Sequence, residues 1–148
     1  MDDRDFFQSA PFPTPARPLT GLTLLVVEDS RYARDALRLM AQHSGARIRW
    51  ANSLCAAERH LDIYTPSVAI IDLGLPDGDG TQLIARLHNT SPRIGIILGT
   101  SGDDAAGETV LAAGADGFLP KPVTSLASFQ ELILSRLPEA CRPMAPRI

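Results

Sequence analysis

The sequence predicts an α/β protein built on a doubly wound, five-stranded parallel sheet with five helices. Short apolar runs rich in β-branched residues alternate with segments of helical period over residues 21–137, which is typical of repeated βα units. Two of the apolar runs end abruptly in carboxylates, at Glu28-Asp29 and at Asp72. In such sheets functional groups gather beyond the carboxyl ends of the strands, so we expect the site there.

The first two βα units are predicted from residues 22–62. The continuous apolar run 22–27 indicates a strand that is buried on both faces. Ser30 can cap the helix that follows, and Gly45 can end it. Apolar residues alternate with arginines over 46–50, which predicts a strand with one wet face at a sheet edge. Ser53 can cap the next helix.

The third unit begins with a second buried run, 68–71, which ends in Asp72. A loop rich in Gly and Pro follows. Asp79 and Gln82 can form a capping box at the start of the next helix. The predicted core face of that helix consists of Leu83, Ile84 and Leu87.

The last two units are shorter. Residues 94–98 predict a central strand that ends before Gly99. The helix at about 104–113 is expected to be weak and mobile, because Gly107 interrupts it at a cost of about 1 kcal/mol relative to Ala. Residues 118–119 predict the last strand. The final helix carries the apolar residues Leu126, Phe129, Leu132 and Ile133.

Proline-containing segments flank the predicted domain. Residues 1–20 hold four prolines without apolar periodicity, so we expect a disordered or extended tail. Residues 21–137 form the domain. Residues 138–148 contain three further prolines and are expected to be a tail or the stub of a linker to an output domain.

Composition excludes several classes of protein. The chain has 148 residues, 45% of them apolar and 21% charged, which is typical of one globular domain. Its net charge of -3 gives no electrostatic footprint for nucleic acid, and its apolar runs are too short to span a bilayer. The N-terminus lacks the pattern of a secretory signal, so a cytoplasmic location is expected. The isolated Cys55 and Cys141 indicate neither a metal cluster nor a disulfide.

Three carboxylates should converge if the first and third strands are neighbours. Glu28, Asp29 and Asp72 would then repel one another unless a proton is held or a cation is bound, and oxygen ligands of this kind suit Mg²⁺. Asp29 could instead serve only as a helix cap. Lys121, between two prolines at another strand end, is the expected positive partner, and the Lys121-Pro122 bond is a candidate for a cis peptide.

Three segments together resemble the receiver domain of bacterial two-component response regulators, of the stand-alone chemotaxis-regulator-like type. They are Glu28-Asp29, the run DLGLPDGDG at 72–80, and the run GADGFLPKP at 114–122. The resemblance covers residues 21–137. It implies a flavodoxin-like fold with strand order 2-1-3-4-5.

The resemblance also implies a role for each site residue. Asp72 would accept a phosphoryl group from a sensor histidine kinase or a histidine phosphotransfer protein, forming a phosphoprotein with an aspartyl phosphate. Asp29, Asp72 and the backbone carbonyl of Gly74 would bind Mg²⁺, with Glu28 acting through water. Lys121 would pair with the phosphoryl oxygens. The domain would be a phosphorelay switch rather than an enzyme, catalysing only its own phosphoryl transfer and slow dephosphorylation.

Two positions depart from the family pattern. The family usually has a Thr or Ser whose hydroxyl reports phosphorylation to the rest of the domain. Counting residues forward from Asp72 in the family spacing places this hydroxyl at Thr100. Counting back from Lys121 selects Gly99, which has no hydroxyl. A receiver-like scaffold that works without phosphorylation is therefore the alternative function. The aromatic residue of the last strand is Phe118, where the family often has Tyr.

The implied partners are the kinase or phosphotransfer protein and an unidentified downstream protein, without direct contact to nucleic acid or membrane. A homodimer through the fourth helix, fifth strand and fifth helix is a further implied assembly. Two rivals fit less well. An aspartate-nucleophile phosphatase needs an acid where Gly74 stands, and a flavin protein needs a phosphate-binding loop where Glu28-Asp29 would repel phosphate.

Overall fold

The structure is a computed structural model that describes residues 17–90 and 94–137. Its centre is a five-stranded parallel sheet in the order β2-β1-β3-β6-β7. The strands are β1 (Thr23–Val27), β2 (Arg47–Ala51), β3 (Val68–Asp72), β6 (Ile96–Ser101) and β7 (Gly117–Pro120). Because β4 (Gly74–Leu75) and β5 (Gly78–Asp79) form a separate antiparallel pair, the main strands follow the expected order 2-1-3-4-5.

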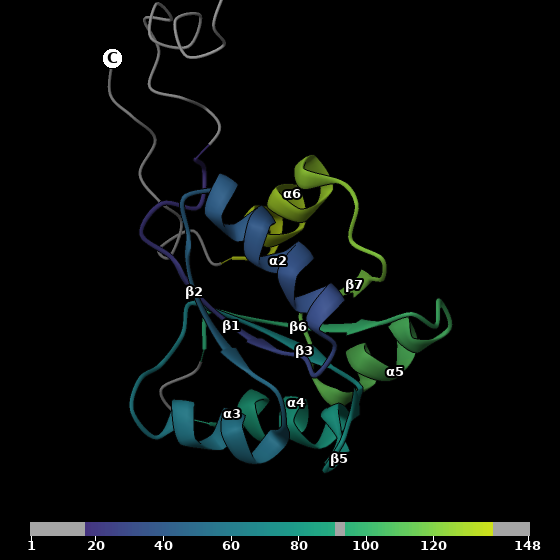
Figure 1. Cartoon of the computed structure of the whole chain (residues 1–148). Helices are drawn as coiled ribbons and strands as arrows, with labels where there is room; N and C mark the ends of the chain where they lie inside the picture. The colour runs from purple at the N-terminus through teal and green to yellow at the C-terminus, as the bar shows by residue number, and fades with distance from the viewer. Residues whose placement is uncertain (1–16, 91–93, 138–148) are drawn as a thin grey trace, which may run out of the picture.

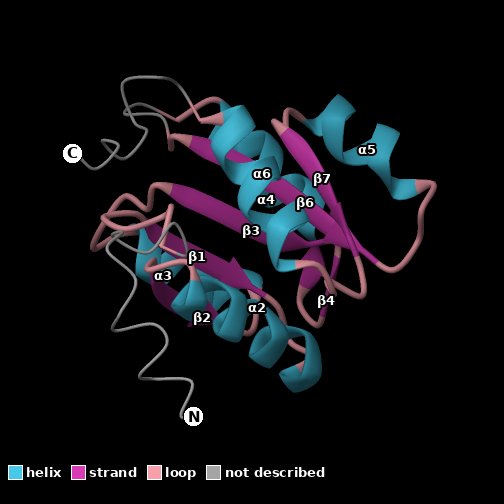
Figure 2. Cartoon of the chain, turned by 90° about the horizontal axis from the view of Figure 1, so that it is seen from above, coloured by secondary structure: helices cyan, strands magenta, loops and turns pink. Residues whose placement is uncertain are grey.

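Helices cover both faces of the sheet, as Figure 1 shows. On one face lie α2 (Arg31–His43) and α6 (Leu126–Arg136). On the other lie α3 (Leu54–Leu61), α4 (Gly80–His88) and α5 (Ala106–Ala113). Seen from the side of α2 and α6, the strands run side by side with these two helices across them (Figure 2). This confirms the predicted doubly wound architecture.

The sheet separates two apolar cores. The first lies under α2 and α6 and includes Leu37, Phe129 and Ile133. The second lies under α3, α4 and α5 and includes Ile84 and Val110. Every residue of β3 is buried, as predicted for a strand covered on both faces. No helix among residues 17–90 and 94–137 is both long and apolar enough to cross a bilayer.

Side-chain caps begin four of the helices. Ser30 and Ser53 cap α2 and α3 as predicted, Asp79 caps α4 through Thr81 rather than through the predicted box with Gln82, and Ser125 caps α6. The Asp79 carboxylate accepts the N–H of Thr81 at 2.9 Å. These bonds satisfy N–H groups that have no partner inside the helix, which fixes where each helix starts.

Two predicted boundaries need correction. Gly99 and Thr100 lie inside β6 rather than after it, because pairing with β3 and β7 continues to the end of the strand. Helix α5 begins at Ala106, so Gly107 lies in its first turn and does not interrupt its interior. The expected weakness of α5 stays a prediction, and its basis changes: Ala105 precedes the helix and provides no side-chain cap.

The predicted N-terminal boundary is also wrong by a few residues. Leu19, which we assigned to the tail, is fully buried in the core beneath α2 and α6. Its N–H donates to the carbonyl oxygen of Ser44 at 2.9 Å. Residues 17–20 therefore belong to the folded part. The predicted tails at 1–16 and 138–148 lie outside the described residues.

Gly99 allows α5 to approach β6 closely. A Cβ atom at Gly99 would lie 2.4 Å from Cγ1 of Val110, which is far inside contact distance. At Gly107, in contrast, a Cβ atom would lie 3.4 Å from the ring of Phe118, an ordinary contact. The two glycines therefore form a matched pair for testing how tightly α5 packs.

We expect Gly99→Ala to lower the free energy of unfolding by about 1–3 kcal/mol, because the added methyl overpacks the core. The control Gly107→Ala should leave it unchanged or raise it by about 0.5 kcal/mol through helix propensity. Urea denaturation of both variants measures the difference. Equal stability of the two would show that α5 is not held against β6 as described.

Candidate functional site

The site lies at the carboxyl ends of the central strands. Because Val27 of β1 pairs with Ile71 of β3, the residues that follow them emerge at the same edge. One carboxylate oxygen from each of Glu28, Asp29 and Asp72 lies within 4.8 Å of the other two. The structure therefore brings together the three carboxylates that the sequence analysis singled out, and Lys121 joins them from the end of β7.

Glu28 is fully buried at this edge. Its Oε1 atom accepts a hydrogen bond from Nζ of Lys121 at 2.5 Å, and its Oε2 accepts the N–H of Ser30 at 3.2 Å. Burial raises the pKa of Glu28, the bond from Lys121 opposes this, and the neighbouring Asp72 adds to the increase. A buried anion at this position therefore depends on Lys121 for its charge partner.

Asp72 is 6% exposed and also faces Lys121, whose Nζ lies 3.2 Å from its Oδ1. Burial by itself lowers the pKa of Lys121, but the bond to Glu28 and the charges of Glu28 and Asp72 outweigh it and raise the pKa. Lys121 is the only lysine in the chain, and its bond to Pro122 is cis. The ammonium group of Lys121 thus bridges the carboxylates of Glu28 and Asp72.

The register of the sheet bears on the choice between Thr100 and Gly99. Thr100 is the pairing partner of Asp72, so the two side chains point to the same face. Thr100 is 1% exposed, and its hydroxyl donates to the carbonyl oxygen of Leu119 at 2.6 Å. Gly99 pairs with Ile71 and faces α5. The hydroxyl next to Asp72 therefore belongs to Thr100.

The donor set fits a small divalent cation. With the three carboxylates ionised and Lys121 protonated, the cluster carries a net charge of -2. Mg²⁺ prefers oxygen ligands at roughly 2.1 Å, which puts ligands on opposite sides of the ion about 4 Å apart. The 4.8 Å span of Glu28, Asp29 and Asp72 is close to this, and exposed Asp29 opens the cluster to solvent. Gly74, two residues after Asp72, donates its N–H to Oδ1 of Asp72 at 3.4 Å.

Two supporting residues were not predicted from the sequence. The indole N–H of Trp50 donates to the backbone carbonyl of Glu28 at 2.6 Å, and the guanidinium of Arg34 lies 4.0 Å from the centre of the indole ring. Asp77, in the loop after β3, accepts two backbone N–H groups from the start of α3. The hydrogen bonds of Trp50 and Asp77 join segments more than twenty residues apart, so no local sequence pattern predicts them.

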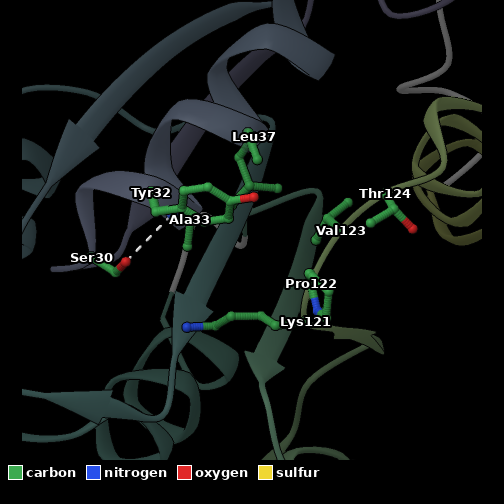
Figure 3. Close-up of a pocket in the computed structure, with 9 residues that line it drawn as sticks. Ser30, Tyr32, Ala33, Leu37, Lys121, Pro122, Val123 and Thr124 are labelled. Atoms are coloured by element: carbon green, nitrogen blue, oxygen red, sulfur yellow. Dashed lines mark hydrogen bonds between the residues drawn. The ribbon is translucent and has the colours of Figure 1, made fainter.

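A cavity of about 240 Å³ lies next to Lys121, between the start of α2 and the loop after β7 (Figure 3). Lys121 and Pro122 line it on one side, and Ser30 and Tyr32 on the other. Tyr32 is 83% exposed.

Comparisons with known proteins agree on one family. The family model described as the response regulator receiver domain matches residues 24–133. The transcriptional regulatory protein PhoP of Escherichia coli O157:H7 is 35% identical over 102 residues, which are 68% of this chain and 46% of PhoP. The virulence transcriptional regulatory protein PhoP of Salmonella typhimurium is 34% identical over the same share. The chain thus spans about half the length of the curated relatives it matches.

Solved structures show the same fold. A response regulator from Chloroflexus aurantiacus J-10-fl is 30% identical, with a TM-score of 0.69 over 78% of this chain and 98% of that one. The receiver domain of the sensor histidine kinase PA1611 from Pseudomonas aeruginosa PAO1 is 21% identical, with a TM-score of 0.70 over 79% and 98%. That structure has a magnesium ion coordinated in its active site cleft.

Removing one of the three negative charges should stabilise the metal-free protein. We expect Asp72→Asn to raise the free energy of unfolding by about 1 kcal/mol in EDTA, because repulsion from Glu28 and Asp29 exceeds the attraction lost at Lys121. Urea denaturation measures this, with the exposed Asp104→Asn as control. A loss of stability in Asp72→Asn would mean that the pair with Lys121 dominates.

Removing the positive charge of Lys121 should have the opposite effect. We expect Lys121→Met to lower the free energy of unfolding by about 2 kcal/mol, because Glu28 stays buried without its partner, and Lys121→Arg to recover part of the loss. Because the pKa of Lys121 is raised in the fold, its contribution should persist up to the usual value of 10.5 and disappear as the pH rises further. Denaturation of each variant from pH 7 to 11 tests both points, and equal stability of Lys121→Met and the unmodified protein would contradict them.

Proposed function

This chain belongs to the response regulator receiver domain family, and from that premise we propose that Asp72 accepts a phosphoryl group and thereby switches contacts with other proteins. The observation that carries the proposal is the position of Asp72, which lies among two further carboxylates with Nζ of Lys121 3.2 Å from its Oδ1. The donor of the phosphoryl group would be a phosphohistidine on a sensor histidine kinase or a histidine phosphotransfer protein.

In the transfer, a carboxylate oxygen of Asp72 forms a bond to phosphorus as the bond from phosphorus to the imidazole nitrogen breaks. The electron pair of the broken bond stays on the nitrogen. Lys121 holds a positive charge beside the oxygens that gain negative charge, and Glu28 holds Lys121 in place. The chemistry is therefore mainly positioning and charge stabilisation.

Mg²⁺ is the cofactor that we propose for the site, held by Asp29, Asp72 and the backbone carbonyl of Gly74, with Glu28 acting through water. When bound, it neutralises charge on the carboxylates and on the phosphoryl oxygens. The oxygen-only donor set and the net charge of -2 support this choice. The magnesium ion in the P. aeruginosa receiver domain gives further support.

We propose that Thr100 transmits the change at Asp72 to the rest of the fold. Its hydroxyl donates to the carbonyl oxygen of Leu119 in β7, so turning toward a phosphoryl group would break that bond. The neighbouring Phe118 packs against Gly107 of α5, which links β7 to the helix without a side-chain cap. The response surface would therefore include α5, β7 and α6, where a homodimer could also form.

The cavity beside Lys121 supports a partner-binding role for the same end of the domain. Tyr32 projects from α2 at its edge and could contact a kinase or phosphotransfer protein that approaches Asp72 (Figure 3). We further propose a cytoplasmic location. The relatives are named transcriptional regulators, and the expectation that this domain itself makes no direct contact with nucleic acid stays a prediction.

The scaffold alternative depended on Gly99 filling the switch position. Since Asp72 pairs with Thr100, the specific reason for favouring that alternative is gone. We therefore propose phosphorylation of Asp72, and not a scaffold role, as the function of the domain.

The proposal predicts that acetyl phosphate with Mg²⁺ increases the mass of the protein by one phosphoryl group, and that Asp72→Asn or removal of Mg²⁺ by EDTA prevents it. Beryllofluoride with Mg²⁺ should change hydrogen exchange across residues 104–119. Thr100→Val should still be phosphorylated but lose the exchange response, and Thr100→Ser should keep it. An unmodified protein that gains no mass would overturn the proposal in favour of the scaffold.

A further inference from the structure

We propose that Asp77 is a positioning residue that fastens the loop after the phosphoacceptor to the start of α3 and so fixes the Mg²⁺ ligands in that loop. This inference rests on the proposed function, because it concerns how the same site is held ready for the cation. It is independent of which kinase or target the domain serves.

The carboxylate of Asp77 makes two hydrogen bonds to a helix that lies more than twenty residues before it. The N–H of Leu54 donates to Oδ1 at 2.8 Å, and the N–H of Cys55 donates to Oδ2 at 3.0 Å. Ser53 serves the same helix end by accepting the N–H of Ala56 at 3.1 Å. Asp77 thus accepts hydrogen bonds from the first-turn N–H groups that Ser53 does not bind, so the loop completes the N-terminal capping of α3.

Charge strengthens this contact. The N–H groups of Cys55 and then Leu54 hold the pKa of Asp77 below its usual range. The carboxylate is therefore ionised near neutral pH, and an anion is favoured at the positive end of the helix dipole. The backbone also approaches closely here, since a Cβ atom at Gly78 would lie 2.7 Å from Cδ1 of Leu54.

The other end of the loop is tied to the site. Residues Gly74–Leu75 and Gly78–Asp79 pair as a two-stranded hairpin, with Gly74 opposite Asp79. The N–H of Gly80 donates to the carbonyl oxygen of Leu73 at 3.0 Å, and a Cβ atom at Gly80 would collide with the backbone of Asp72. The hairpin is therefore a short, closed unit whose tip is held by Asp77 and whose base adjoins Asp72.

This arrangement connects the clamp, by which we mean the contact between Asp77 and the start of α3, to metal binding. Gly74, the residue proposed to offer its carbonyl to Mg²⁺, belongs to the hairpin and donates its N–H to Asp72. Loosening the tip of the hairpin would let Gly74 sample other positions. Binding of Mg²⁺ would then carry the additional entropic cost of ordering Gly74. Residues that orient metal ligands typically change metal affinity by about 10- to 100-fold when removed, and we expect about 3- to 10-fold for this more distant contact.

The test compares Asp77→Ala and Asp77→Asn with Ser53→Ala. Ser53→Ala is the matched control, because it removes a cap from the same end of α3 without touching the loop. The first measurement is hydrogen exchange of residues 74–79 in metal-free protein. The second is the Kd for Mg²⁺ alone, measured by titration calorimetry.

Asp77→Ala should speed exchange in the hairpin and raise the Kd for Mg²⁺ by about 3- to 10-fold. Asp77→Asn keeps one acceptor oxygen, so its Kd should fall between that of Asp77→Ala and that of the unmodified protein. Ser53→Ala should lower the thermal midpoint but leave the Kd within about twofold of the unmodified protein. If Asp77→Ala does not fold, Asp77→Asn carries the comparison.

Unchanged exchange in the Asp77 variants would show that the clamp does not hold the hairpin. Faster exchange with an unchanged Kd would overturn the positioning role alone. A shift in Kd that is equal for Ser53→Ala and Asp77→Ala would assign the effect to stability of α3. Failure of the unmodified protein to bind Mg²⁺ would overturn the proposed function, and with it the role of Asp77 toward the cation.

Discussion

The main constraint on the structure is that three carboxylates are held together against their mutual repulsion. Glu28, Asp29 and Asp72 lie within 4.8 Å of one another, and Lys121 contacts two of them. Such a cluster costs free energy, so a chain selected for stability alone would avoid it. The cost is offset by the buried strands β1 and β3, whose apolar side chains anchor the backbone from which these acids emerge. This repulsion favours a cation at the site over a metal-free cluster.

Contacts from outside the cluster keep its backbone in place. Trp50 on the edge strand bonds to the carbonyl of Glu28, and the N–H of Glu28 donates to the carbonyl of Ala51 at 2.9 Å. On the other side, the hairpin after Asp72 reaches α3 through Asp77. The loops around the site are thus tied to one another rather than only to their own strands.

Much of the fold could be predicted because its signals are local. The buried runs, the caps at Ser30 and Ser53 and the edge position of β2 all follow from neighbouring residues. The errors arose where contacts between segments distant in the sequence override the local pattern. Gly99 looked like the end of a strand, but β6 continues because it pairs on both sides. Leu19 looked like part of a proline-rich tail, but it is buried under α2.

The sequence by itself singled out the three carboxylates and the lysine that the fold brings together, because strand ends and charged residues can be identified along the chain. It could not choose between Thr100 and Gly99, since counting from two directions gives two answers. Only the register of β3 against β6 places Thr100 beside Asp72 and turns Gly99 toward Val110. The contacts of Trp50 and Asp77 likewise exist only in three dimensions, because their partners lie more than twenty residues away and meet through the winding of the sheet.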